Sequence, residues 1–138
     1  MEQITWTPAL SIGVEEIDRQ HKQLIKLVNE LLAMDNIRVD SEMISDALTR
    51  MTDYANYHFT SEEKFMQEQG YPQFEAHRRQ HVEFIRKTAE LAIGAIAHRK
   101  TVPVEMLEYL KSWLVNHIMI SDMKIRDFVE RKKISASS

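Results

Sequence analysis

Seven side chains of metal-binding type recur at helical spacings along this chain. Five are imidazoles, from a total of six histidines in 138 residues, and two are carboxylates. They are His21, His58, His77, His81, His117, Glu62 and Asp122. A structural zinc ion usually takes four ligands, so this set exceeds the need of one such ion. It suits two six-coordinate metals that share bridging groups, and imidazole is a good ligand for iron, copper, zinc and nickel. The residue types therefore predict a two-metal site.

The spacing of two pairs supports joint ligation. His58 and Glu62 are four residues apart in the sequence, as are His77 and His81. On an α-helix this spacing gives an offset of about 40° and a separation of about one turn. Both members of each pair can therefore reach one site from the same helix face.

The third pair, His117 and Asp122, has a spacing that a regular helix does not accommodate. Five residues give an offset of about 140°, which is poor for joint ligation. Beyond Asp122, apolar Ile125 and Val129 restore a rhythm of three and four, as if one residue had been inserted. We therefore predict a π-bulge or a similar distortion near residues 118–122, because such bulges often occur at functional sites.

The ligand candidates fall on the apolar stripes of the helices, where a polar group costs free energy unless it is paired or coordinated. A single inward histidine is more often hydrogen-bonded in a core than bound to metal. Five histidines from four helices are too many to satisfy one another, so a shared metal is the better interpretation. His98 is the exception, because it lies beyond its stripe beside Arg99 and Lys100. We expect His98 at an exposed helix end and not in the site.

Four amphipathic helices must position these side chains. The first is expected over residues 15–35, with a stop at Asp35-Asn36. The second begins after Asp40-Ser41, either of which can cap it, and ends at Gly70. The third runs from about Phe74 past Ala95 to the basic segment 98–100, and Pro103 opens the fourth.

Helices of this length joined by short connections predict an all-α fold, an antiparallel up-down-up-down four-helix bundle. The chain of 138 residues is long enough for one domain with a core and too short for two, so we expect a single domain over residues 1–138. Residues 1–13 are expected to form an extended N-terminal arm anchored by Trp6. Residues 134–138 are expected to be a frayed tail.

The composition excludes several classes of function. Hydrophobic residues make up 43% of the chain and charged residues 28%, and the net charge is -3. No basic stripe suited to nucleic acid occurs. The chain contains no cysteine, which excludes disulfides and thiolate ligands. We expect no signal peptide and no membrane span, and a cytoplasmic protein.

The ordered set His21, His58-x3-Glu62, His77-x3-His81 and His117-x4-Asp122 resembles the hemerythrin family, in particular its bacterial single-domain members. The resemblance implies a non-haem di-iron centre. His77, His81 and His117 would hold one iron, and His21 and His58 would hold the other. Glu62 and Asp122 would bridge the two irons together with an oxo or hydroxo group. The iron with two histidines would keep an open position for O2.

The resemblance also implies an apolar pocket for O2. Its members would be Leu24, Phe59, Trp113, Leu114 and Ile118. Each of these side chains also suits ordinary core packing. Leu114 is the best candidate for a gate, because its offset from His117 places it beside a ligand.

The function expected from this resemblance is reversible O2 binding, as an oxygen carrier, store or delivery protein, and not an enzyme activity. One alternative is a di-iron peroxidase or oxidase that uses the same site. Another is a sensor of O2, NO or iron, and zinc or manganese in place of iron is a third. The expected partners are O2 and an unidentified reductase or oxygen-using enzyme. We expect a monomer.

Overall fold

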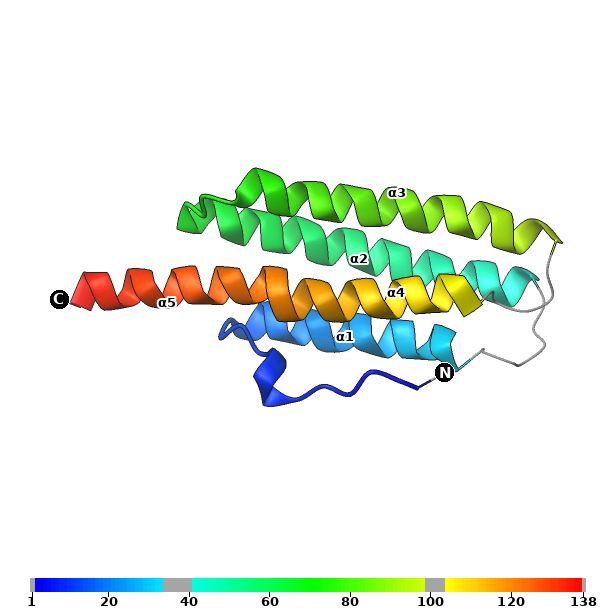
Figure 1. Ribbon diagram of the computed structural model, residues 1–138, viewed down its shortest axis with the longest axis horizontal. Helices are drawn as coiled ribbons and strands as arrows, with labels where there is room; N and C mark the ends of the chain where they lie inside the picture. Colours follow the sequence, from blue (N-terminus) through cyan, green and yellow to red (C-terminus); the bar gives the residue numbers. More distant parts are fainter. Residues whose placement is uncertain (1, 34–40, 99–103, 138) are drawn as a thin grey trace.

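The computed structural model describes residues 2–33, 41–98 and 104–137, and over these ranges the chain forms an antiparallel bundle of long helices (Figure 1). The first three are α1 (Glu15–Leu32), α2 (Ser41–Gln69) and α3 (Phe74–His98). A fourth rod consists of α4 (Val104–Asn116), the π-helix η2 (His117–Asp122) and α5 (Met123–Ser137). No strand occurs within the described ranges. The predicted all-α up-down-up-down bundle is confirmed.

The helix ends differ from the predictions in two places. Helix α1 ends at Leu32 and not at residue 35, and the N–H of Ala33 closes its last turn on the carbonyl of Asn29. The tail expected to fray continues α5 to Ser137. Ile134, within this tail, is 69% exposed. The predicted signals Asp35-Asn36, Asp40, Arg99-Lys100 and Pro103 lie outside the described residues, as does the side chain of His98.

The turn between α2 and α3 sets the distance between Glu62 and His77. The last residue of helix α2 is Gln69, and Gly70 terminates the helix as predicted. Gly70 has a φ of +68°, which glycine adopts without strain. The N–H of Tyr71 donates to the carbonyl of Met66 at 2.9 Å, so the last turn is closed by a bond characteristic of glycine-capped helix ends. The chain then reverses within a few residues and begins α3 at Phe74.

The N-terminal arm lies along the bundle and contains one short 3-10 helix, η1 (Pro8–Leu10) (Figure 1). Asn29 holds one end: its side-chain oxygen accepts from the N–H of Ile4 at 2.8 Å, and its amide donates to the Ile4 carbonyl at 2.9 Å. Asp18 holds the other end by accepting from the N–H of Ile12 at 2.8 Å. Trp6 packs against the apolar core of the bundle, and the ammonium of Lys22 lies 5.2 Å from the centroid of the Trp6 ring. The predicted anchor is therefore confirmed.

The fourth rod contains the predicted distortion. Residues His117–Asp122 form a π-helix, which turns more slowly than an α-helix and so brings both ends of the five-residue interval to one face. His117 and Asp122 are both buried, and Ile125 and Val129 are buried after them. The π-bulge prediction is confirmed, and the inserted residue is what keeps α5 in register with the core.

The buried apolar side chains form two separate clusters. The larger includes Leu31, Met51 and Leu110 and fills the end of the bundle where α4 begins. The smaller consists of Met66, Tyr71, Ile125 and Val129. Along α2, Glu62 lies between Phe59 of the larger cluster and Met66 of the smaller, so a polar layer separates the two cores. No helix in the described ranges is long and apolar enough to cross a membrane.

Candidate metal centre

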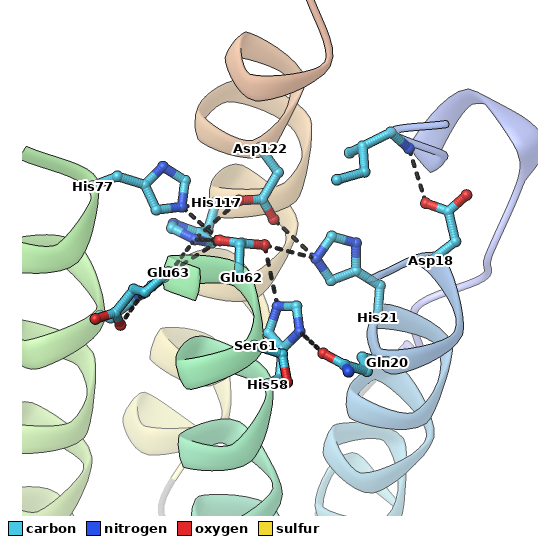
Figure 2. A network of polar contacts seen from close by, with 12 residues as sticks. Asp18, Gln20, His21, His58, Ser61, Glu62, Glu63, His77, His117 and Asp122 are labelled. Carbon is cyan, nitrogen blue, oxygen red and sulfur yellow. Dashed lines mark hydrogen bonds and ion pairs between the residues drawn. The ribbon is translucent and has the colours of Figure 1, made fainter. Parts of the chain in front are cut away.

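The seven predicted ligand residues meet in this polar layer, which the close view in Figure 2 shows around the carboxylate of Glu62. All seven are buried, and the most exposed of them, His117, has only 4% of its surface accessible. They come from every rod of the bundle: His21 from α1, His58 and Glu62 from α2, His77 and His81 from α3, and His117 and Asp122 from η2. The sequence set is therefore brought together completely.

Each of the two carboxylates points one oxygen toward one group of histidines and its other oxygen toward a second group. Glu62 Oε1 lies 2.6 Å from His77 Nε2 and 3.1 Å from His81 Nε2, whereas Glu62 Oε2 lies 3.3 Å from His58 Nε2. Asp122 Oδ1 lies 3.1 Å from His77 Nε2, and Asp122 Oδ2 lies 3.0 Å from the Nε2 atom of His21. Each carboxylate thus has the geometry of a bridge between two sites.

The histidines divide unequally between the two groups. His81 Nε2 lies 3.0 Å from His117 Nε2, and His117 Nε2 lies 3.2 Å from Asp122 Oδ1. With His77, these residues form a group of three. His21 and His58 form a group of two, in which the ring centroids are 4.6 Å apart. Each group, together with shared carboxylate oxygens, places its potential ligand atoms within 4.8 Å of one another.

The outer ring nitrogens of three histidines donate hydrogen bonds in a pattern that passes from helix to helix. His58 Nδ1 donates to Gln20 Oε1 at 2.8 Å, across α1 and α2 (Figure 2). His81 Nδ1 donates to Glu63 Oε2 at 2.9 Å, across α2 and α3.

The third bond in this pattern joins α3 to η2. His117 Nδ1 donates to Gln80 Oε1 at 3.0 Å, and the hydroxyl of Ser121 donates to the same oxygen at 2.7 Å. In all three bonds the acceptor is the immediate sequence neighbour of one ligand candidate and serves a histidine on the next helix. Because these bonds hold a proton on Nδ1, the neutral form of each ring has the lone pair on its inward Nε2, and this is the form that binds metal.

The electrostatics of the layer are dominated by its buried carboxylates. Burial lowers the pKa of His21, but hydrogen bonds and charges from Asp122 and Glu62 outweigh it and raise this pKa to about 10. The same balance raises the pKa of His117 to about 9 and raises that of His77. Burial prevails at His58, whose pKa is lowered.

The carboxylates respond in the opposite sense. Burial alone would raise the pKa of Glu62, yet hydrogen bonds from the histidines hold it well below its ordinary value. The pKa of Asp122 is also lowered, since contacts with His117 and His21 outweigh burial and the charge of Glu62. Without a metal, the layer therefore neutralises its two negative charges with protons on imidazoles.

Several buried polar atoms in the layer lack a hydrogen bond of good geometry, although some lie close to a group of opposite charge. They are both ring nitrogens of His21, Oε2 of Glu62 and both carboxylate oxygens of Asp122. An unsatisfied buried polar group costs about 1–3 kcal/mol, and more when it is charged. Four of these five atoms face the interior of the layer, where cations would coordinate them. The donor set of imidazole nitrogens and carboxylate oxygens thus fits a pair of divalent metals.

The residues predicted to line an O2 pocket lie on two sides of the layer. Phe59 stacks on the ring of His81 with centroids 4.0 Å apart, and Trp113 stacks on His117 at 4.4 Å. Leu114 and Ile118 instead line an apolar cavity of about 260 Å³ between the N-terminal arm and the bundle.

Leu24, the fifth predicted member, is buried in the larger core cluster one turn after His21. The other side chains around the cavity come mainly from the arm, including Ile4 and Leu10, and α1 contributes Ile25. Sequence reasoning missed this contribution of the arm. It also missed the three acceptors Gln20, Glu63 and Gln80, for which the one available signal is their adjacency to His21, Glu62 and His81.

Comparison with known proteins gives a consistent result. The family described as "Hemerythrin HHE cation binding domain" matches residues 12–128. A bacteriohemerythrin of Stenotrophomonas maltophilia is 32% identical over 94% of this chain and 84% of its own length. A bacteriohemerythrin of Methylococcus capsulatus is 35% identical over 86% of this chain and 90% of its own.

A crystal structure of wild-type hemerythrin superposes with a TM-score of 0.76 at 32% identity, covering 88% of this chain and 94% of that one. The matched family region contains all seven ligand candidates, and the shared fold is the one that brings them into a single buried layer. On these grounds the chain belongs to the hemerythrin family.

Proposed function

We propose that this protein binds two iron ions in the polar layer and binds O2 reversibly at one of them. The observation that best supports the proposal is the division of the layer, in which each carboxylate faces both a group of three histidines and a group of two. His77, His81 and His117 would hold one iron, and His21 and His58 the other. Glu62 and Asp122 would bridge them, with an oxo or hydroxo group between.

The unequal division is what would make ligand binding possible. Three imidazoles and the shared bridging groups would fill the ligand positions of a six-coordinate metal on one side, while two imidazoles would leave one position free on the other. When bound, the pair of Fe(II) ions would supply one electron each to O2, and the same electrons would return when O2 leaves.

The protein's own residues set the charge of the site. Glu62 and Asp122 offset two of the four positive charges of two Fe(II) ions, and a bridging hydroxide would offset a third. The layer would therefore be near neutral, which lowers the cost of burying it. Five of the seven protein ligands are neutral imidazoles, and this favours reversible binding because anionic ligands stabilise the higher oxidation states needed to cleave the O–O bond.

An apolar cavity between the N-terminal arm and the bundle supports binding over catalysis. The 260 Å³ cavity that includes Leu114 and Ile118 is lined by apolar side chains and by two threonines, Thr5 and Thr7. No acid or base is among these lining residues. Such a lining would exclude water and slow the proton transfers that convert reversible binding into oxidation.

The test is to load the protein with Fe(II) without air, to measure iron per chain, and to follow visible absorption as O2 is added and removed. We expect two irons per chain and an absorption band that disappears when O2 is withdrawn. His77→Gln should lose about one iron, while His98→Gln, the histidine outside the set, should keep both. A single iron in the unmodified protein, or a band that persists after O2 removal, would contradict the proposal.

A further inference from the structure

Glu63 differs from the other acceptors that hold the outer nitrogens of the histidines. Gln20 and Gln80 are neutral amides, whereas Glu63 offers a carboxylate oxygen to His81 Nδ1 at 2.9 Å. Its side chain is 25% exposed, so its charge is partly shielded from water at the edge of the bundle. Of the outer acceptors found in the described part of the chain, Glu63 is the one that brings a charge.

The imidazole of His81 is held between two consecutive carboxylates of α2. Its Nε2 lies 3.1 Å from Glu62 Oε1, and its Nδ1 donates to Glu63 Oε2. Figure 2 shows Glu62 at the centre of the layer, while Glu63 lies away from that centre. Adjacent residues on one helix thus contact opposite edges of the same ring.

The face of this ring is fixed as well. Phe59 stacks on His81 with an interplanar angle of 6°, and Phe59 precedes Glu63 by one turn of α2. With a face and both edges in contact, the ring has little freedom to turn. A change of charge at Glu63 would therefore act on the electron density of the imidazole and not on its position.

We propose that Glu63 acts through His81, making this imidazole a stronger electron donor than its companions and so favouring the oxidised state of the metal that the three histidines would hold. The inference rests on the metal site proposed above. A hydrogen bond to a carboxylate is stronger than one to an amide, and a carboxylate behind a metal-bound histidine raises the basicity of the ring. Within the described residues, Glu63 forms its ion pair with His81, at 2.9 Å.

The location of the charge gives it a functional meaning. The metal favoured for oxidation would be the one whose coordination is complete, and the metal with the free position would be bordered by neutral Gln20 and by the unpartnered Nδ1 of His21. The two metals would then differ in electron density as well as in ligand number.

The experiment compares Glu63→Gln with the unmodified protein and with Glu68→Gln. The first variant keeps a hydrogen-bond acceptor but removes the charge. The second removes the same charge from an exposed position on the same helix and is the matched control. The first measurement is the affinity for Co(II) alone, and the second is the reduction potential of the iron-loaded protein. The couple is the one-electron reduction of Fe(III) to Fe(II) at each iron, with electrons supplied by a chemical mediator.

We expect Glu63→Gln to weaken Co(II) binding about tenfold, as loss of such outer partners typically does. We also expect it to lower the equilibrium constant for oxidation about tenfold, which is a rise in potential of about 59 mV. Glu68→Gln should change neither. The double variant Glu63→Gln/Gln80→Glu moves the carboxylate from His81 to His117 within the same group, and it should restore both values.

Two results would overturn the inference. One is a Glu63→Gln protein that unfolds more easily yet keeps the Co(II) affinity and the potential, since Glu63 would then be a structural contact only. The other is a double variant with no recovery, since the effect would then not pass through the charge on an imidazole. Failure of the unmodified protein to take up iron would count against the proposed function, while the ratio of Co(II) affinities would still test Glu63.

Discussion

Metal binding should expel protons from the layer, because the metal-free protein holds protons on histidines that must become ligands. The pKa of His21 is raised to about 10 and that of His117 to about 9. At pH 7 these protons therefore oppose metal binding by roughly three and two powers of ten, which is about 7 kcal/mol in all. The pKa of His58 is lowered, so its ring is neutral at this pH and contributes no proton to this release.

The assay is a calorimetric titration of the metal-free protein with Co(II) at pH 7, repeated in buffers that differ in their enthalpy of ionisation. The dependence of the heat on the buffer gives the number of protons released. We expect at least two per chain, and a combined apparent affinity that rises about a hundredfold between pH 7 and pH 8. The rise should flatten as the pH passes 9 and then 10.

A matched pair of variants locates the cause. Asp122 contributes to the raised pKa values of both His21 and His117, so Asp122→Asn should lower both in a histidine titration of the metal-free protein by NMR. Asp127→Asn, on the exposed side of α5, should leave both unchanged. Binding without proton release at pH 7, or equal histidine titrations in the two variants, would refute the reasoning.

In the metal-free protein, protonation of His21 and His117 contributes to the free energy of unfolding. This contribution is complete below the ordinary histidine pKa of 6.5 and is lost as the pH rises through about 9 and 10. Thermal unfolding should thus occur at a lower temperature at pH 10 than at pH 6.5, and the reverse order would contradict this balance. Asn29→Ala removes two hydrogen bonds to the backbone of Ile4, so the arm should lose about 2 kcal/mol of docking free energy. Faster amide exchange at Ile4 would verify this, and unchanged exchange would speak against it. Leu114→Ala enlarges the cavity beneath the arm, should cost about 2–5 kcal/mol of stability, and should hasten autoxidation of the iron-loaded protein. An unchanged rate of autoxidation would remove Leu114 as a gate.

The features that could be predicted from the sequence are those imposed by a repeating spacing. His58 with Glu62 and His77 with His81 reveal helix faces, and the five-residue interval before Asp122 reveals the π-helix because a buried carboxylate cannot lie on the wrong face. Chain topology then follows from the helix lengths and short connections.

The features that could not be predicted depend on contacts between helices. Gln20, Glu63 and Gln80 are ordinary polar residues for an amphipathic helix, and no periodicity distinguishes them. Their role appears only when the next helix is in place, since each serves a histidine that is distant in the sequence. The end of α1 at Leu32 was likewise hidden, because the apolar stripe ends gradually there.

The polar layer divides the hydrophobic interior of this bundle into two separate cores, one on each side of the layer. The smaller core has four buried members, Met66, Tyr71, Ile125 and Val129, too few to hold the end of the bundle by themselves. The connection between this end and the larger core passes through the layer of histidines and carboxylates. Metals bound in the layer would cross-link the four rods at the boundary between the two cores. The two ends of the bundle would then unfold as one cooperative unit. The side chains that would hold the metals would then also determine whether the last turns of α2 and all of α5 open independently of the rest.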